Sequence, residues 1–375
     1  MQKWIDRDAA LALLRVKPQT LYAYVSRGRI RMEPDPLDAR RSHYSAEDVA
    51  QLAGRRARGR KPAAIAAGSM AWGEPAIATS LSTAFRGRLF YRGQDAVELA
   101  QSAKLEQVAA LLWDCPGAIS FESAAIADAS AFDALAAMIP TAQPILGRGI
   151  ATLASDATAI IGTLASACGA TPGKEPVHLR LAKGWGCDLR AADKLRQALV
   201  VMADHDLNAS TFAVRVAAST GASLAASVLA GLCALSGPRH GGAAAALASL
   251  IADARKDDID TALDRWLDRG VELAGFGHPL YPGGDPRASL LLDGIELDAF
   301  MARLSAAVLA KTGLPPNCDF GLAAMTATLG LPPDAPFRLF LIGRSVGWCA
   351  HAMEQSRSGQ LIRPRGRYEG ILPTG

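Results

Sequence analysis

The stretch ASLAASVLAGLCALSGPRHGG, residues 222–242, indicates how this chain of 375 residues folds. Its leucines and valine recur at the spacing of a helix with one buried face, and Ser236, Gly237 and Pro238 end the pattern. Alanine fills the positions between them, and aromatic residues make up only 6% of the chain. Alanine has the highest helix propensity, whereas strands favour β-branched and aromatic residues, so the sequence predicts a mainly α fold.

The same pattern continues outside this stretch. LEQVAALLW (105–113) and RLFLIGRSVGWCAHAMEQ (338–355) are further apolar helices, and the second contains Arg344. A chain of this length usually forms two or three domains. A lone arginine in so apolar a helix is costly unless an anion meets it, so Arg344 is expected either in a structural ion pair or in a carboxylate clamp.

The positive charge of the chain is concentrated at its N-terminus. Residues 1–61 contain 14 Lys/Arg and 7 Asp/Glu, whereas the remaining residues contain 26 and 29. This asymmetry indicates a separate module with a partner of its own. No signal peptide and no uninterrupted apolar run of about 18 residues is found, so we expect a cytoplasmic protein that does not enter a membrane.

The N-terminal module has the element order of a winged helix-turn-helix. RDAALALL follows an acidic cap at Asp6, Pro18 opens the helix PQTLYAYVSRG, IRMEPDPLDARRSHY is expected to form a hairpin, and Ser45 caps EDVAQLAG. This order resembles the mercury-resistance-regulator and excisionase type of domain. The resemblance implies that DNA and its phosphates are contacted by Gln19, Thr20, Tyr22, Arg27, Arg40 and Arg41. The alternative is a basic cap or oligomerisation domain that binds no DNA.

Three histidines and one aspartate lie in unusual turns of the remaining chain. His205 is flanked by aspartates in MADHDLNASTF, His240 by glycines in SGPRHGG, and His278 lies in GFGHPLYPGGDPRA (275–288). Asp319 stands at a helix start in PPNCDFGLAAM. The chain has no compact metal-ligand spacing, no paired cysteines, no G-x-S-x-G and no phosphate loop. The remaining expectation is acid–base chemistry, with no metal and no permanently bound cofactor.

Several long motifs together resemble the citrate synthase family. They are YRGQDAVELAQSAKLEQVAALLWDCP, ADHDLNASTFAVRVAASTGASLAASVLAGLCALSGPRHGG, GFGHPLYPGGDPRA, NCDFGLAA and LFLIGRSVGWCAHAMEQSRSGQLIRPRGRYEG. The resemblance covers residues 70–375 and implies a large and a small helical domain. The expected boundaries are a winged helix-turn-helix at 1–54, a basic linker at 55–69, the large domain at 70–236 and 333–375, and the small domain at 237–332.

The resemblance also implies an activity, the condensation of acetyl-CoA or another acyl-CoA, as co-substrate, with oxaloacetate. It assigns Asp319 as the base, His240 as the partner of the enol oxygen, and His278 as the acid at the oxaloacetate carbonyl. It further implies that oxaloacetate is bound by His205, Arg287, Arg344 and Arg363. In the family the arginine that matches Arg363 reaches into the site of the other subunit, so a homodimer is expected.

Two departures from the family pattern leave alternatives open. Pro282 stands where the family has a base that contacts a CoA phosphate, and Ala244 replaces the asparagine of HGGAN. A lost charge-assisted contact costs about 1.5–3 kcal/mol of binding free energy. The alternatives are a 2-methylcitrate synthase that uses propionyl-CoA, and a transcriptional regulator whose synthase-like body senses a metabolite and whose residues 1–61 bind DNA.

Overall fold

The chain divides into two compact units. The computed structural model describes residues 4–14, 16, 18–26, 30–35, 42–50, 77–124, 129–270, 272–366, 368 and 370. One unit contains Met1–Ile77 with Pro364–Gly375, and the other contains Ala78–Arg363. The described part is mainly helical, which confirms the predicted fold class. The finer domain boundaries at 237 and 333 stay a prediction.

In its described residues the N-terminal unit has helices α1 and α2, a helical stretch at 46–50 and a small sheet around a core of its own. Helix α1 spans Arg7–Leu14 and α2 spans Pro18–Ser26, and Asp6 Oδ1 accepts a hydrogen bond from Ala9 N at 2.8 Å. The antiparallel sheet has the order β1-β3-β2, and its strands are β1 Trp4–Ile5, β3 Ser42–Ser45 and β2 Met32–Pro34. The core includes Ala10, Leu21, Ile30, Tyr44 and Val49.

The larger unit begins with a second three-stranded antiparallel sheet and continues with helices. Its strands are β4 Ser82–Phe85, β5 Arg88–Tyr91 and β6 Gln94–Asp95, and Ser82 pairs with Tyr91 across β4 and β5. The helices are α5 Ala96–Ser102, α6 Leu105–Trp113, α7 Ala131–Met138, η1 Ile139–Thr141, α8 Ile150–Ala167, α9 Val177–Gly184, α10 Leu189–Met202, α11 Ala209–Ser219, α12 Leu224–Leu235, α13 Ala243–Lys256, α14 Ile259–Asp268, α15 Pro286–Leu292, α16 Ala299–Thr312, α17 Cys318–Leu329 and α18 Ala335–Ser358.

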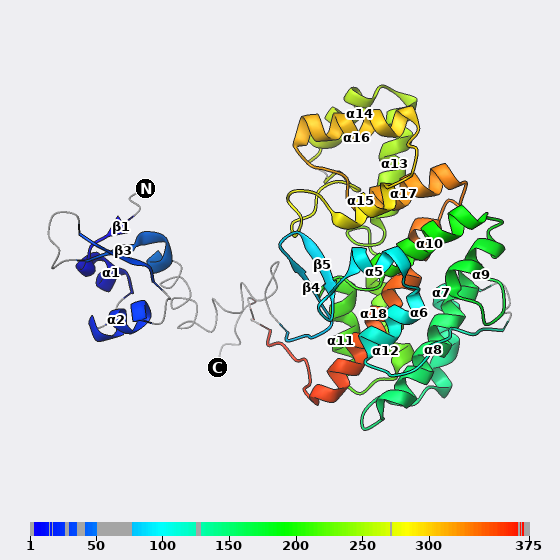
Figure 1. Cartoon of the computed structure of the whole chain (residues 1–375), viewed down its shortest axis with the longest axis horizontal. Helices are drawn as coiled ribbons and strands as arrows, with labels where there is room; N and C mark the ends of the chain where they lie inside the picture. Colours follow the sequence, from blue (N-terminus) through cyan, green and yellow to red (C-terminus); the bar gives the residue numbers. More distant parts are fainter. Residues whose placement is uncertain are drawn as a thin grey trace. The chain divides into compact units, whose positions relative to one another are not determined.

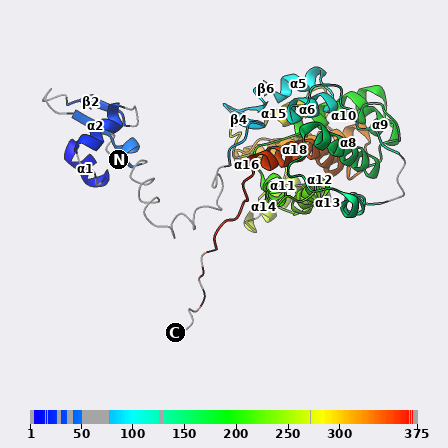
Figure 2. The same cartoon turned by 90° about the horizontal axis from the view of Figure 1, so that it is seen from below.

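Helix α18 is the centre of the main hydrophobic core. It packs against α6, α8, α10, α11 and α12, and Figure 2 shows it enclosed between these helices. Its residues from Leu339 to Met353 are almost all buried, which explains why no amphipathic pattern marks this helix in the sequence. Helix α8 is long and apolar enough to cross a membrane, but its apolar face contributes to this same core.

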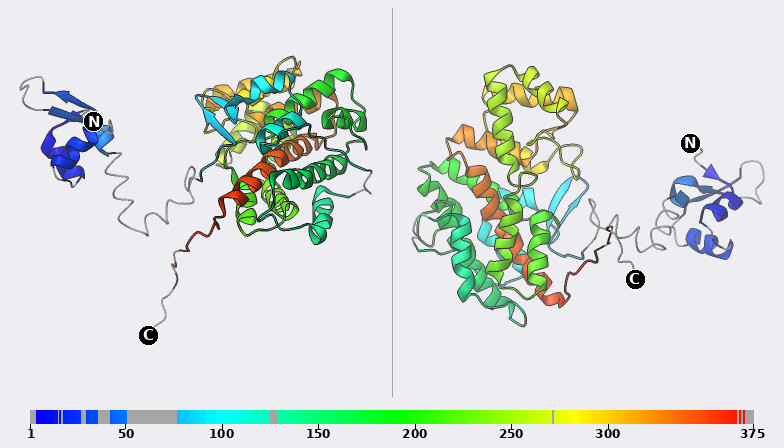
Figure 3. Two further views of the ribbon diagram at one scale, coloured as in Figure 1. Left: turned by 60° about the horizontal axis from the view of Figure 1, so that its bottom comes forward. Right: turned by 180° about the vertical axis from the view of Figure 1, so that it is seen from behind.

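A second hydrophobic cluster lies at one end of the larger unit. Helices α13, α14 and α16 form it together with Phe276 and Phe320, and Figures 1 and 3 show these helices gathered there. Helices α15 and α17 connect the two clusters, since Leu291 and Leu322 belong to the main core whereas Phe320 and Ala324 belong to the second. Cys233 is exposed on α12, although the residues around it in the sequence are apolar.

Candidate active site

His205 lies on the connection between α10 and α11 and is buried. Its Nε2 atom is 2.9 Å from Tyr281 Oη, and its ring centroid is 4.9 Å from that of His278 in an edge-to-face arrangement. Burial, and then the charges of Arg287 and Arg344, hold the pKa of His205 well below its usual value. His205 is therefore a neutral imidazole beside a second histidine and two arginines.

Residues 275–285 form a loop whose backbone is fixed by a second loop, and α15 begins at Pro286. Gly277 N donates to Pro315 O at 2.7 Å, and Asn317 N donates to Gly275 O at 2.9 Å. The two glycines have φ of +90° and +70°, a region that other residues rarely adopt. Asn317 Nδ2 also donates to Gly277 O at 3.0 Å, while its Oδ1 accepts from Asp319 N at 2.9 Å. The loop of His278 and the helix start of Asp319 are thus tied together by one asparagine.

A backbone amide sets the protonation of His278. Leu280 N donates to His278 Nδ1 at 3.2 Å, and a peptide N–H has no acceptor capacity, so Nδ1 carries the lone pair. Burial, and then the charge of Arg287, lower the pKa of His278 to about 4. At neutral pH the ring is therefore uncharged and bears its proton on Nε2, which makes it a hydrogen-bond donor at that atom.

His240 lies in the turn between α12 and α13, held by a polar cluster. Its Nε2 atom is 2.8 Å from Ser210 Oγ, which also donates to Asn208 Oδ1 at 2.7 Å. Trp348 Nε1 donates to the same Ser210 oxygen at 3.3 Å. Burial, and then the charge of Arg344, lower the pKa of His240 to about 4. Since Nε2 faces Ser210, Nδ1 is the nitrogen that remains for a ligand.

Asp319 occupies the first turn of α17, and its carboxyl group has an unusual acidity. Burial raises its pKa to about 6, while the charges of Arg287 and Arg344 act in the opposite direction. At neutral pH this group is ionised, yet it binds a proton more tightly than an exposed aspartate does. A carboxylate with these properties suits a general base.

Arg287 and Arg344, the two arginines whose charges act on this cluster, differ in how they are paired. Arg287 is buried at the start of α15 and donates to Asp285 through Nε at 2.9 Å and Nη2 at 2.8 Å. Asp285 also accepts from Cys318 N at 3.1 Å, so it fixes Arg287 against the start of α17. Because these two hydrogen bonds use Nε and Nη2, the Nη1 atom of Arg287 is left to bind another anion.

Arg344 has a different environment in the middle of α18. Its Nε donates to Met202 O at 3.0 Å, and its guanidinium lies 4.7 Å from the ring centroid of Phe340, which also contacts His240. Its Nη2 atom is buried without a hydrogen-bond partner among the described residues, and the described residues contain no ion pair of Arg344. This geometry fits an anion clamp better than a structural ion pair.

The remaining predicted residues lie elsewhere. Arg363 is exposed beyond α18, with no side-chain hydrogen bond or ion pair in the described part of the chain. In the N-terminal unit Tyr22 is exposed and Thr20 is half-buried. The side chain of Gln19 and all of Arg27, Arg40 and Arg41 lie outside the described residues, so these assignments stay predictions.

The sequence did not indicate several residues that hold this cluster. Tyr281 contacts His205, and its ring lies 5.6 Å from the Arg287 guanidinium carbon. Ser210 and Asn208 hold His240, and Asp285 pairs with Arg287. A signal existed for Tyr281 and Asp285, which belong to the same rigid loop as His278. No such signal existed for Ser210, because serine is a common residue in helices.

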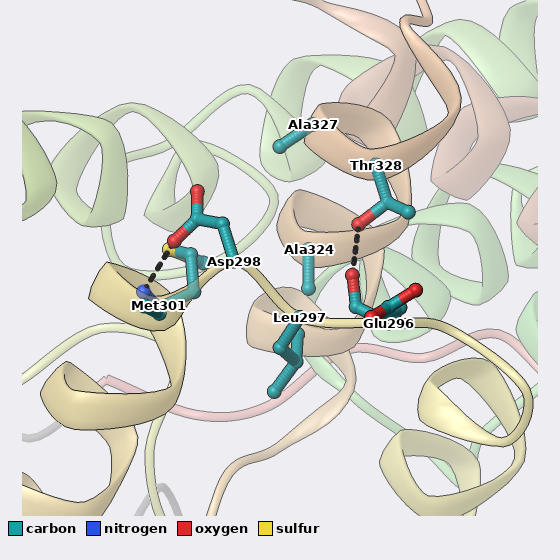
Figure 4. A pocket seen from close by; sticks show the side chains of 8 residues that line it. Glu296, Leu297, Asp298, Met301, Ala324, Ala327 and Thr328 are labelled. Atoms are coloured by element: carbon teal, nitrogen blue, oxygen red, sulfur yellow. Dashed lines mark hydrogen bonds between the residues drawn. The ribbon is translucent and has the colours of Figure 1, made fainter.

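A cavity of about 450 Å³ lies apart from this cluster (Figure 4). It is lined by Glu296, Leu297, Asp298, Ala299, Met301, Ala324, Ala327 and Thr328, from the α16 and α17 region. None of the predicted site residues lines it. The described residues hold no group of three His, Cys, Asp or Glu side chains arranged for a metal ion.

Comparisons of this chain with known proteins all lead to the same family. The model of the citrate synthase C-terminal domain matches residues 150–365. The chain is 37% identical over 187 residues to putative citrate synthase 2 of Mycobacterium bovis, covering 46% of this chain and 50% of that protein. It is 39% identical over 193 residues to citrate synthase of Haloferax volcanii, covering 48% and 50%. It is 36% identical over 187 residues to 2-methylcitrate synthase of Shewanella oneidensis, covering 47% and 50%. The matched part of the chain spans about half the length of these relatives.

Solved structures show the same fold at low sequence identity. Citrate synthase from Thermotoga maritima superposes with a TM-score of 0.69 at 23% identity, over 81% of this chain and 96% of that one. The second is citrate synthase from Thermoplasma acidophilum, in a ternary complex with carboxymethyl coenzyme A and oxaloacetate. It superposes with a TM-score of 0.67 at 23% identity, over 80% and 95%.

Proposed function

The chain belongs to the citrate synthase family, and from this we propose that it condenses acetyl-CoA with oxaloacetate and that water then hydrolyses the thioester of the product, which gives citrate and CoA. The observation that carries the proposal is the combination of a basic carboxylate, neutral histidines and the buried Arg344 guanidinium, whose Nη2 atom has no hydrogen-bond partner among the described residues. A thioester α-proton is too weakly acidic for a free carboxylate to remove quickly. The site must therefore supply a positioned base and stabilise the enolate that forms.

In this proposal Asp319 removes the α-proton of the thioester. Its raised pKa makes it a stronger base than an exposed carboxylate, while the charges of Arg287 and Arg344 keep it ionised at neutral pH. A general base of this kind contributes about 10²- to 10⁴-fold to the rate. Asn317 accepts a hydrogen bond from the backbone of Asp319 and donates one to the His278 loop. It therefore fixes the position of the proposed base, Asp319, relative to the proposed acid, His278.

His240 would hydrogen-bond the developing enol oxygen through Nδ1. As a neutral imidazole it donates there only when the Ser210 hydroxyl turns its proton toward Nε2. Ser210 has a second acceptor in Asn208 Oδ1, so the direction of one hydroxyl proton decides whether His240 is a donor or an acceptor. Neutral imidazole matches the enol in acidity better than imidazolium does. Imidazolium would transfer its proton to the enolate oxygen outright.

His278 would donate from Nε2 to the carbonyl oxygen of oxaloacetate and then transfer its proton as the new carbon–carbon bond forms. The Leu280 amide favours this tautomer before any substrate binds. The carboxylates of oxaloacetate would be bound by Arg344 through its unpartnered Nη2, by Arg287 through Nη1, and by His205. Guanidinium groups suit this task because their planar fork matches a carboxylate.

We also propose that two chains complete each site. Arg363 is exposed and has no side-chain hydrogen bond or ion pair among the described residues, which supports a role on another copy. The family resemblance assigns it that role across a homodimer.

The acyl donor has one close alternative, propionyl-CoA, which would yield 2-methylcitrate. The similarity to 2-methylcitrate synthase of Shewanella oneidensis supports it. One methylene changes binding by only about 1–3 kcal/mol, so both thioesters are reasonable substrates.

The test is thiol release from acetyl-CoA and from propionyl-CoA, with and without oxaloacetate, using the full chain. We expect oxaloacetate-dependent release from at least one thioester and its loss in Asp319→Asn. Release from neither thioester by folded protein, confirmed as a cooperative thermal transition, would contradict the proposed activity.

A second function is favoured by the separate N-terminal unit, and we propose that this unit binds DNA. The unit has its own core, and its two helices followed by a β2–β3 hairpin agree with a winged helix-turn-helix. Asp48 and Glu47 bind the guanidinium of Arg31, which makes this arginine a weaker candidate for a phosphate contact. The module would therefore rely on the basic residues at 27, 40 and 41.

Retardation of the chain's own upstream DNA at low salt tests this second function. We expect retardation that weakens as salt rises, because counterions are released, and that disappears for a chain beginning at residue 77. Equal retardation by the shortened chain would show that the N-terminal unit is not responsible.

A further inference from the structure

His205 is held by an unusual stretch of backbone. Its neighbour Asp206 has φ of +54°, the left-handed region that side chains with a Cβ atom avoid. Its other neighbour, Asp204, is fully buried and lies beside α18, where Gly347 N donates to Ala203 O at 3.0 Å. A strained residue and a buried carboxylate flanking a candidate ligand-binding histidine both require a stabilising partner.

Ser82, the first residue of β4, contacts both neighbours of His205. Its hydroxyl donates to Asp204 Oδ2 at 2.5 Å and accepts from Asp206 N at 3.1 Å. Both directions follow from chemistry, because Asp206 N can only donate and a hydroxyl has one proton to give. The side chain of Ser82 is buried, although it is 122 residues away from Asp204 in the sequence.

The strand partner of Ser82 contacts the same connection. Tyr91 pairs with Ser82 across β4 and β5, and its buried hydroxyl lies 3.0–3.1 Å from the carbonyl oxygens of Val200, Val201 and Asp204. The small sheet therefore presents two adjacent hydroxyl groups to the segment that carries His205. Tyr91 contacts only backbone at the start of this segment, whereas Ser82 contacts the two residues on either side of the histidine.

The Asp204 carboxylate is fixed from the opposite side by a polar chain. Arg215 Nε donates to His351 Nδ1 at 3.0 Å, so the other ring nitrogen, Nε2, is the one that donates to Asp204 Oδ2 at 3.1 Å. Arg215 in turn binds Glu354. The same carboxylate oxygen thus accepts from Ser82 and from His351, which leaves the Asp204 side chain little freedom to move.

We propose that Ser82 is a positioning residue for His205, which it holds at the site by bonding Asp204 and the left-handed backbone of Asp206. This inference rests on the proposed role of His205 in binding oxaloacetate. Ser82 touches no reacting atom in this arrangement. Its removal releases the strained turn at Asp206, and the His205 ring then leaves the position set by Tyr281 and His278.

The first experiment compares Ser82→Ala with Ser82→Thr. We expect Ser82→Ala to raise the KM for oxaloacetate about ten-fold, the effect of one lost hydrogen bond to a charged group, with a much smaller change in kcat. Ser82→Thr keeps the hydroxyl and is expected to stay close to the wild-type KM. Ser227→Ala is the matched control, because Ser227 is a buried serine whose hydroxyl, within the described part of the chain, donates to the carbonyl of Ser223, the residue that caps its own helix.

A double substitution separates positioning from general loss of stability. Glycine adopts a φ of +54° without a steric penalty, so Asp206→Gly is expected to restore part of the oxaloacetate affinity that Ser82→Ala removes. An unchanged KM in Ser82→Ala would overturn the proposal. So would an effect that Ser82→Thr shares in full, or equal effects of Ser82→Ala and Ser227→Ala.

A spectroscopic measurement keeps this inference distinct from the proposed activity. The ¹⁵N signals of the His205 ring depend on its bond to Tyr281 and not on turnover. We expect Ser82→Ala to shift them and Ser82→Thr to leave them near the wild-type positions, even if no thioester were consumed. Loss of thiol release in the wild-type protein would contradict only the proposed activity, whereas unshifted His205 signals in Ser82→Ala would contradict the positioning role.

Discussion

The protonation of the candidate active site is decided by contacts that distant parts of the chain supply. The sequence indicated His205, His240 and His278 because each lies in a glycine-rich or aspartate-flanked turn. It could not indicate that all three are neutral, since that follows from burial and from the charges of Arg287 and Arg344. The positions of these histidines were predictable, whereas their charge states required the fold.

Replacement of the proposed base is expected to separate activity from stability. Asp319→Asn should lower kcat by about 10²- to 10⁴-fold, because the amide cannot accept the α-proton. The wild-type rate should fall as the pH drops through about 6, the pKa to which burial raises this carboxyl group. Thiol release between pH 5 and 8 measures both effects, and a rate that does not change across pH 6 would contradict this role.

The same substitution should stabilise the folded protein at neutral pH. Because the pKa of Asp319 is higher in the folded chain than the usual 3.8, the folded state binds more protons than the unfolded state between pH 4 and 6. The buried carboxylate therefore costs stability above pH 6, and this cost disappears as the pH falls below 4. We expect Asp319→Asn to raise the free energy of unfolding by about 1–3 kcal/mol at pH 7.5, measured by urea unfolding.

Among the elements, helices were easier to predict than their packing partners. The periodic stretch 222–242 became α12 and the turn of His240, and 338–355 lies within α18. The role of the β4–β5 hairpin was not predictable, because Ser82 and Tyr91 meet residues more than 100 positions away. A sequence pattern reports which face of an element is buried, but it does not report what covers that face.

The approach of α18 to the His205 connection depends on the absence of a side chain. A Cβ atom at Gly347 would lie 2.6 Å from Asp204 Oδ1 and closer still to the Ala203 carbonyl oxygen, neither of which can move without displacing His205. We expect Gly347→Ala to lower the free energy of unfolding by about 1–3 kcal/mol through overpacking and to weaken oxaloacetate binding.

Gly149→Ala is the control for the Gly347 substitution. Gly149 precedes α8 with an ordinary negative φ, and a Cβ atom there would meet nothing within 4 Å. Calorimetric unfolding of both variants, with oxaloacetate titration, measures the difference. Equal behaviour of the two variants would show that the contact of α18 with Asp204 does not matter for binding.

The whole chain combines two units that the sequence separated by charge and that the structure separates by their hydrophobic cores. The family resemblance assigns Arg363 to the site of a second copy, and this assignment stays a prediction. Arg363 is the last residue of the larger unit and is exposed, so its proposed partner lies on a second copy. The question can be answered by mixing two inactive variants.

A mixture of Asp319→Asn and Arg363→Ala chains, denatured and refolded together, is expected to regain about a quarter of the wild-type activity. In a mixed dimer one site receives both substitutions and the other receives neither, provided that Arg363 serves the partner's site. If Arg363 serves its own chain, every site carries one substitution and the mixture stays inactive. Each variant refolded alone is the control.

The neutral histidines have a consequence for how the protein responds to its surroundings. His240 and His278 lose their protons near pH 4, and the pKa of His205 lies well below its usual value. Burial raises the pKa of Tyr281 and of Cys318. Once Asp319 is ionised, none of these described groups changes charge between about pH 7 and 9. The proposed activity should then follow a plateau over this range instead of a bell-shaped curve.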